Sequence, residues 1–342
     1  MQQCYIGKTR IQFIDIAKGI AIICIILGHL GNALINRVVF TFHVPIFFFI
    51  TGFFISERRT TSSFIKQKAK TLLLPYYITC FVIIVIGTLI GVYYGNGKDS
   101  LFNWIYASLY AAGDNYSEPF YIKGIGAIWF LWATFWGSIF LRITLKYNIY
   151  LRLSCILLLF LVGYASARFI WLPLSIQAGA CATLFMYIGF LTQKSKSTLK
   201  QLPFESKLFY FILAAFVWFS FIYNFQSFWL VHCDIGRGII DIVGCICACS
   251  IVFLISYTIA TKTSFWAHPL EYIGKCSLLV LCIHIIELNL FPWWKITEYL
   301  NQNQSSTISL LIIIVLKLIL DLSLTIIMSR ITIIRRLFCL SD

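Results

Sequence analysis

Three ionisable residues with side chains capable of chemistry lie in one apolar stretch near the amino terminus. The stretch from Arg10 to His29 is long enough to cross a bilayer, yet it contains Asp15, Lys18 and His29. Ionisable groups inside a membrane helix are costly, so they usually face a protein interior or a water-filled path and mark function. An imidazole titrates near neutral pH and is suited to general-base catalysis.

These three residues share one face of the expected helix. At 100° per residue, Lys18 and His29 differ by about 20° of rotation, and Asp15 lies within about 60° of both. The helical rise places His29 roughly 16 Å from Lys18. Such a stripe suits a polar channel that ends at an imidazole. The spacing equally allows a structural Asp15–Lys18 pair and a histidine at a wet helix end.

Two further histidines lie in apolar stretches. His284 and Glu287 are three residues apart, so an imidazole and a carboxylate can pair on one helix face. His284 is equally compatible with a structural hydrogen bond between helices, and the same holds for His43.

The composition indicates which elements must position these residues. The chain has 342 residues, of which 60% are hydrophobic and 12% charged, and its mean hydropathy is +0.87. That leaves too little polar surface for a soluble globule. The net charge of +14 does not indicate a nucleic-acid partner, because the basic residues lie in loops between apolar stretches. We therefore expect an all-α, polytopic membrane helical bundle.

Ten apolar stretches are expected to cross the membrane, although the fourth is short. They run near 11–31, 38–56, 72–94, 127–141, 150–170, 173–191, 208–225, 236–259, 274–291 and 307–329. Lys and Arg number 19 on the side that holds both termini and six on the other, with Lys18 and Lys317 inside stretches. Because cytoplasmic loops hold the excess of basic residues, we expect both termini in the cytoplasm. The twelve cysteines lie mostly within the stretches and are expected to be small apolar residues rather than disulfides.

Several segments follow one another in a recognisable order. Ten residues separate Lys18 from His29, FHVPIFFFITGFF follows in the second stretch, AIWFLWATF in the fourth and MYIGFL in the sixth, and LEYIGKCSLLVLCIHIIEL spans the ninth. Together these segments resemble the acyltransferase 3 family of integral membrane O-acyltransferases. That family often has arginine at the position of Lys18 and in the basic loop near 57–71.

The resemblance implies a single acyltransferase 3-like domain over residues 1–342, without the extra-membrane domain of some members. It implies transfer of an acyl group, usually acetyl, from cytoplasmic acyl-CoA to a sugar hydroxyl of a surface polysaccharide or its lipid-linked precursor. We expect a multi-pass protein of the inner membrane. Its expected partners are acyl-CoA (acetyl-CoA), a carbohydrate acceptor and the lipid bilayer, with a homo-oligomer left open and no metal.

The resemblance also gives the candidate residues roles. His29 is the expected general base, with Lys18, His284 and Glu287 as the other candidates for the catalytic site. The candidates for binding the phosphates of acyl-CoA are Arg10, Arg58, Arg59, Lys66, Lys68 and Lys70. The alternative for the basic loop is that its charges only set the topology. Trp129, Asp234 and Arg237 are candidates for contact with the acceptor, and a loop turn is the alternative for the last two.

Two other functions remain open from the sequence. Buried charges also mark the substrate and proton paths of transporters, but the two related halves typical of many transporters are not evident. The other alternative is a component that carries the acyl group across the membrane without transferase chemistry of its own.

Overall fold

The computed structural model describes residues 10–56, 60–262 and 265–340. Within these ranges the regular structure is helical, and extended pairing is limited to an isolated bridge between Tyr116 and Ile122. The α-helices are α1 (Gln12–Gly28), α2 (Ala33–Val39), α3 (Pro45–Phe53), α4 (Thr61–Lys68), α5 (Leu74–Tyr93), α6 (Gly97–Tyr110), α7 (Trp129–Thr144), α8 (Ile149–Ser166), α9 (Ile176–Lys194), α10 (Lys196–Gln201), α11 (Phe204–Tyr223), α12 (Ile239–Thr261), α13 (Ala267–Lys275), α14 (Ser277–Leu290), α15 (Trp293–Asn303), α16 (Ser306–Ser329) and α17 (Thr332–Leu337).

The all-α membrane architecture is confirmed. Each of the ten predicted spans overlaps at least one helix, and six described helical segments are long and apolar enough to cross a membrane. A seventh is possible if α13 and α14, which bend by 72° at their junction, count as one broken span. With 17, 9 and 16 residues respectively, α1, α3 and α7 are shorter. The count of ten spans and the side of the termini therefore remain predictions.

The basic segment expected as a loop near 57–71 is helical from Thr61 onward. Thr60 caps this helix, since its hydroxyl accepts a hydrogen bond from the backbone N–H of Ser63. A π-helical turn over Ala69–Leu73 then joins α4 to α5 without a break. Lys66, Lys68 and Lys70 therefore project from a helical backbone and take fixed directions.

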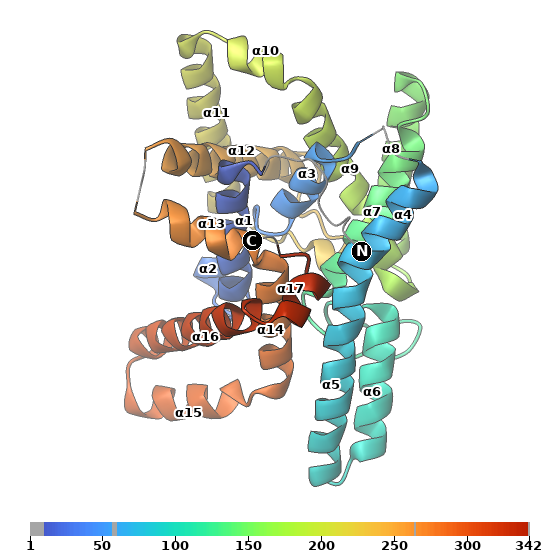
Figure 1. The fold of residues 1–342 in the computed structure, drawn as a ribbon, viewed down its shortest axis with the longest axis vertical. Coiled ribbons are helices and arrows are strands. Elements are labelled where there is room, and N and C mark those ends of the chain that lie inside the picture. The colour runs from blue at the N-terminus through green and yellow to red at the C-terminus, as the bar shows by residue number, and fades with distance from the viewer. Residues whose placement is uncertain (1–9, 57–59, 263–264, 341–342) are drawn as a thin grey trace.

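Helices α1 and α13 pack closely against each other at two glycines. A Cβ atom on Gly274 would overlap the backbone oxygen of Asp15, and one on Gly19 would overlap that of Leu270. Only glycine permits this approach of two backbones. The contact brings the break between α13 and α14 beside the charged part of α1 (Figure 1).

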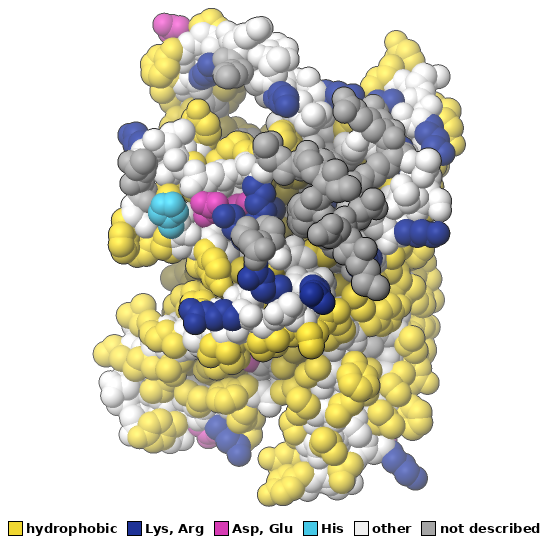
Figure 2. All heavy atoms as spheres, in the orientation of Figure 1, with side chains coloured by type: hydrophobic (Ala, Val, Ile, Leu, Met, Phe, Trp, Pro, Cys, Tyr) yellow, Lys and Arg dark blue, Asp and Glu magenta, His cyan; other side chains and the backbone are white. Residues whose placement is uncertain are grey.

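The outer helices expose apolar side chains. In Figure 1, α5 and α6 run side by side at the lower right and α11 projects at the upper left. Of the 20 residues of α11, Phe221 is buried, and Phe216 and Phe219 are more than 70% exposed. Figure 2 shows hydrophobic side chains over the flanks, whereas Lys and Arg side chains gather across the middle of the viewed face. Apolar flanks of this extent suit contact with lipid.

Candidate active site

Two histidines from distant parts of the chain meet at the end of α1. His29 forms the C-cap of α1, and its Nδ1 lies 3.3 Å from Nε2 of His284 on α14. Nδ1 of His29 also lies 2.8 Å from the carbonyl oxygen of Ile25. A carbonyl can only accept a hydrogen bond, so we assign the proton of His29 to Nδ1, which leaves a lone pair on Nε2. Among the described residues, Nε2 of His29 has no hydrogen-bond partner.

Two carboxylates hold the second histidine. Nδ1 of His284 lies 2.9 Å from Oδ2 of Asp321 on α16 and 2.8 Å from Oε1 of Glu287 on its own helix. A ring nitrogen between two carboxylates must donate, so Nδ1 of His284 carries a proton and Nε2 can accept from His29. His284 and Asp321 are fully buried and Glu287 is 6% exposed. The orientation of the His284 ring is therefore fixed.

A lysine and a tryptophan complete this buried cluster. Nζ of Lys317 donates to Oε1 of Glu287 over 3.2 Å and lies 4.3 Å from the centroid of the Trp293 ring. The indole N–H of Trp293 donates to the other oxygen of Glu287. With neutral histidines, two carboxylates face one ammonium group, so the cluster carries one excess negative charge. That charge would stabilise positive charge that develops on the adjacent histidine pair during a reaction.

The same cluster has a donor set that metals use. His284, Glu287 and Asp321 each offer a ligand atom, and these atoms lie within 4.8 Å of one another. One imidazole and two carboxylates suit a transition metal. The Lys317 ammonium group, however, already binds Glu287 and supplies a cation at this position. Glu287 is therefore charge-paired by Lys317, and the expected absence of a metal stays a prediction.

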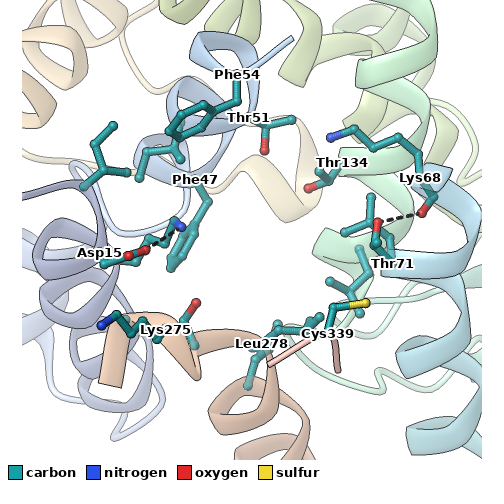
Figure 3. Close-up of a pocket in the computed structure, with 18 of the residues that line it drawn as sticks. Asp15, Phe47, Thr51, Phe54, Lys68, Thr71, Thr134, Lys275, Leu278 and Cys339 are labelled. Carbon is teal, nitrogen blue, oxygen red and sulfur yellow. Dashed lines mark hydrogen bonds and ion pairs between the residues drawn. The ribbon is translucent and has the colours of Figure 1, made fainter. Parts of the chain in front are cut away.

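A cavity of about 630 Å³ runs along α1 (Figure 3). The end that Ile25 and Leu281 line lies toward the histidine pair. One face of α1 lines it with Asp15, Lys18, Ile22 and Ile25, and His29 continues this face one turn beyond Ile25. Leu281 lines the cavity from α14 and precedes His284 by three residues. The apolar end of the cavity therefore stops about one helical turn, roughly 5 Å, short of the histidines.

The other end of the cavity is cationic. Lys18, Lys68 and Lys275 line it from α1, α4 and α13, and Arg10 lies just before α1. Asp15 neutralises part of this charge, because its Oδ1 binds Nζ of Lys18 at 2.9 Å. The Asp15–Lys18 pair allowed by the spacing is thus present, while Lys18 also borders the cavity. Figure 3 shows Lys68 and Lys275 on opposite sides of the space.

The structure separates the basic residues predicted to bind acyl-CoA. Arg10 and Lys68 line the cavity, whereas Lys66 and Lys70 are exposed and are not among the residues that line it. Lys66 and Lys70 lie four residues apart and share a helix face, while Lys68 points to the opposite one. Arg58 and Arg59 lie outside the described residues.

The three residues predicted to contact the acceptor are engaged within the protein. Trp129 is 4% exposed and packs in the core. Arg237 forms an ion pair with Asp241, which is fully buried. Asp234 accepts hydrogen bonds from the Ser227 hydroxyl and the Gly236 backbone N–H. These contacts match the loop turn allowed as the alternative for Asp234 and Arg237, and their contact with the acceptor stays a prediction.

Asp321 and Lys317 were not predicted as site residues. Both lie in the last apolar stretch, four residues apart, as LKLILD. Charged residues inside a membrane span are a signal of the same kind as Asp15, Lys18 and His29. The pairing of α16 with α14 could not be read from spacing, because it is a tertiary contact between different helices.

Comparisons with known proteins identify the family of the chain. The model of a family described as "Acyltransferase domain" (acyltransferase 3) matches residues 11–328, which is most of the chain. The chain is 28% identical over 149 residues to the nodulation protein NolL of Mesorhizobium japonicum. That match covers 39% of this chain and 36% of NolL, so the chain spans about a third of the length of this relative. No solved structure matches. The extent of the family match shows that this multi-pass membrane protein belongs to the acyltransferase 3 family.

Proposed function

We propose that the protein is an inner-membrane O-acetyltransferase that moves an acetyl group from acetyl-CoA to a sugar hydroxyl of a surface polysaccharide or its lipid-linked precursor. The observation that carries the proposal is the His29–His284 contact, because it fixes a free imidazole nitrogen just beyond a cavity with a cationic end. Family membership supports acyl transfer. The donor, the acceptor and the base are our assignments.

The cavity suits the two chemically different parts of an acyl-CoA. The phosphates of CoA are anionic and would meet Arg10, Lys18, Lys68 and Lys275 at the cationic end. The thioester arm is less polar and would lie along Ile22, Ile25 and Leu281, toward the histidines. An arm bound in this way would bring its thioester to within about one helical turn of His29.

His29 would then act as the general base. A sugar hydroxyl is a weak nucleophile, and Nε2 of His29 would take its proton as the oxygen attacks the thioester carbonyl. The new O–C bond forms and the C–S bond breaks. The proton passes from His29 to the leaving sulfur, so the products are the sugar ester and CoA thiol.

The buried cluster would support this step through its charge. The imidazolium formed on His29 lies beside His284, whose Nδ1–H is held by Asp321 and Glu287. A fixed negative charge behind a catalytic histidine stabilises the positive charge that develops in the transition state. Asp321 and Glu287 are positioning residues in this scheme, because they act through His284.

The test compares His29→Ala with His268→Ala, which changes an exposed histidine on α13. A deletion strain is complemented with each variant or with the wild type, and the acetyl content of its extracted surface glycan is measured by mass spectrometry. At equal protein levels, His29→Ala should lower acetylation by about 10²- to 10⁴-fold, the usual contribution of a general base. His268→Ala should restore it. Full restoration by His29→Ala would show that His29 is not the base.

A further inference from the structure

A second hollow lies beyond the histidine end of α1. It is a cleft of about 550 Å³ between α2 and the non-helical segment 225–229. Asn36 and Arg37 line it from α2, Phe40 lines it directly after this helix, and Gln226 and Trp229 line it from the segment. None of the residues that line the cavity beside Lys18 and Lys275 lines this cleft.

The cleft adjoins His29 through one tight contact. A Cβ atom on Gly28 would lie 2.8 Å from the ring of Phe40, and Gly28 directly precedes His29. Phe40 also stacks on His43, with ring centroids 4.8 Å apart. Phe40 lines the cleft and contacts Gly28, so an occupant of the cleft would lie close to the residue that directly precedes His29.

The cleft combines an open aromatic ring with polar groups that have capacity for more hydrogen bonds. Trp229 is 42% exposed, and its ring lies 5.8 Å from those of both Phe40 and His232. Among the described residues, the amide oxygen of Asn36 is buried and has no hydrogen-bond partner, so an occupant would reach it by a rotation of the side chain into the cleft. Arg37 donates one hydrogen bond, to the backbone oxygen of Tyr223, and a guanidinium group has five N–H donors.

The segment HCDIGRG supports the wall of this cleft. Asp234 accepts a hydrogen bond from the hydroxyl of Ser227 over 2.6 Å, and Ser227 lines the cleft. Asp114 binds Nε2 of His232 at 3.0 Å, and the His232 ring stacks on that of Trp229. Asp234 and Asp114 thus hold two of the residues that shape the cleft.

We propose that the cleft between α2 and residues 225–229 binds the carbohydrate acceptor, an assignment that rests on the proposed function. The C–H face of a sugar ring packs against exposed aromatic rings such as that of Trp229, which has a large apolar face. The hydroxyl groups of the sugar can form hydrogen bonds with an amide and a guanidinium group, here those of Asn36 and Arg37. Recognition of this kind needs a mostly apolar wall with a few polar groups, as the cleft provides.

The test uses Trp229→Ala and Asn36→Ala, with Phe219→Ala as the control because that side chain is 73% exposed on α11, outside the cleft. The probe is the unacetylated glycan extracted from the deletion strain. Purified full-length protein is titrated with this glycan, first for binding without acetyl-CoA and then for transfer at saturating acetyl-CoA. Thermal unfolding and the KM for acetyl-CoA report whether each variant is folded with an intact donor site.

Each cleft variant should raise the Kd and the KM for the glycan by about tenfold, the loss expected of an interface anchor. The KM for acetyl-CoA should not change, and Phe219→Ala should change every constant by less than about twofold. Wild-type glycan binding by both cleft variants would overturn the proposal. If the wild type transfers no acetyl group but its glycan binding depends on Trp229, the proposed function fails while the cleft assignment stands.

Discussion

Nδ1 of His29 lies 3.3 Å from Nε2 of His284, although 255 residues separate them in the chain. This contact joins the end of α1 to a group of buried charges on α14 and α16. The hydrogen bonds form one series, in which Nδ1 of His29 donates to Nε2 of His284 and Nδ1 of His284 donates to Asp321. The free Nε2 of His29 is at the end of this series, where a reacting hydroxyl can meet it.

The direction of this series predicts the effect of Asp321→Asn. The amide keeps an oxygen that can accept from His284 but loses the charge that stabilises a proton on the histidine pair. We expect kcat to fall about 10- to 100-fold, which is less than for loss of the base itself. The KM for acetyl-CoA should stay unchanged, because Asp321 does not line the donor cavity.

A pH profile separates this role from a purely structural one. Without the carboxylate, the proton binds the histidine pair less tightly, so the acid limb of kcat should move to lower pH. Asp321→Glu retains the charge and should recover part of the activity. If Asp321→Asn lowered kcat without moving the acid limb, Asp321 would not act through the protonation of His284.

We expect Lys317→Met to lower the stability of the fold and not only the catalytic activity. The variant leaves Glu287 buried without its ammonium partner, close to the second buried carboxylate of Asp321. Breaking a buried ion pair by removing one member typically costs about 3–5 kcal/mol in free energy of unfolding. Thermal unfolding of the purified protein in detergent measures the change. The double variant Lys317→Met with Glu287→Gln should recover part of the lost free energy of unfolding. If the losses of the two single variants simply added in the double variant, the two side chains would not be coupled.

The polar face of α1 could be predicted because it depends on helical periodicity within one segment. Asp15, Lys18 and His29 follow from 100° per residue, and the structure places Ile22 and Ile25 on the same face. The His29–His284 contact and the Asp321 partner could not be predicted in this way. They depend on which helices pack together, and periodicity carries no information on pairs of helices.

The helical state of the basic segment also escaped prediction. When residues 57–71 are taken as a loop, all of their basic side chains are expected to bind acyl-CoA alike. In the helix that forms instead, Lys68 faces the cavity, and Lys66 and Lys70 face away from it. The short spans show a similar limit. Hydropathy finds an apolar stretch at 38–56, but the structure divides it between α2 and α3, with Pro45 at the start of α3.

The direction of Lys68 predicts a difference between neighbouring lysines. Lys68→Ala should raise the KM for acetyl-CoA by about tenfold, since a hydrogen bond to a charged phosphate contributes about 1.5 kcal/mol or more. Lys66→Ala is the matched control and should change this KM by less than about twofold. Steady-state transfer assays with varied acetyl-CoA give both values. Equal effects of the two variants would mean that the segment acts through its general charge and not through the cavity.

From the Asp114–His232 contact we expect the wild type to be more stable than Asp114→Asn by an amount that depends on pH. The hydrogen bond from His232, helped by the backbone N–H of Asn115, holds the pKa of the Asp114 carboxyl below its usual range. A carboxyl whose pKa is lower in the folded state stabilises the fold fully above its unfolded pKa of about 3.9, and this contribution is lost as the pH falls through the folded value. Asp114→Asn should therefore unfold at a lower temperature than the wild type at pH 7, and the gap should close toward pH 3. The gap should be at most about 1 kcal/mol, because solvent screens this half-exposed pair. A gap of constant size between pH 7 and pH 3 would show that the charge of Asp114 does not hold His232.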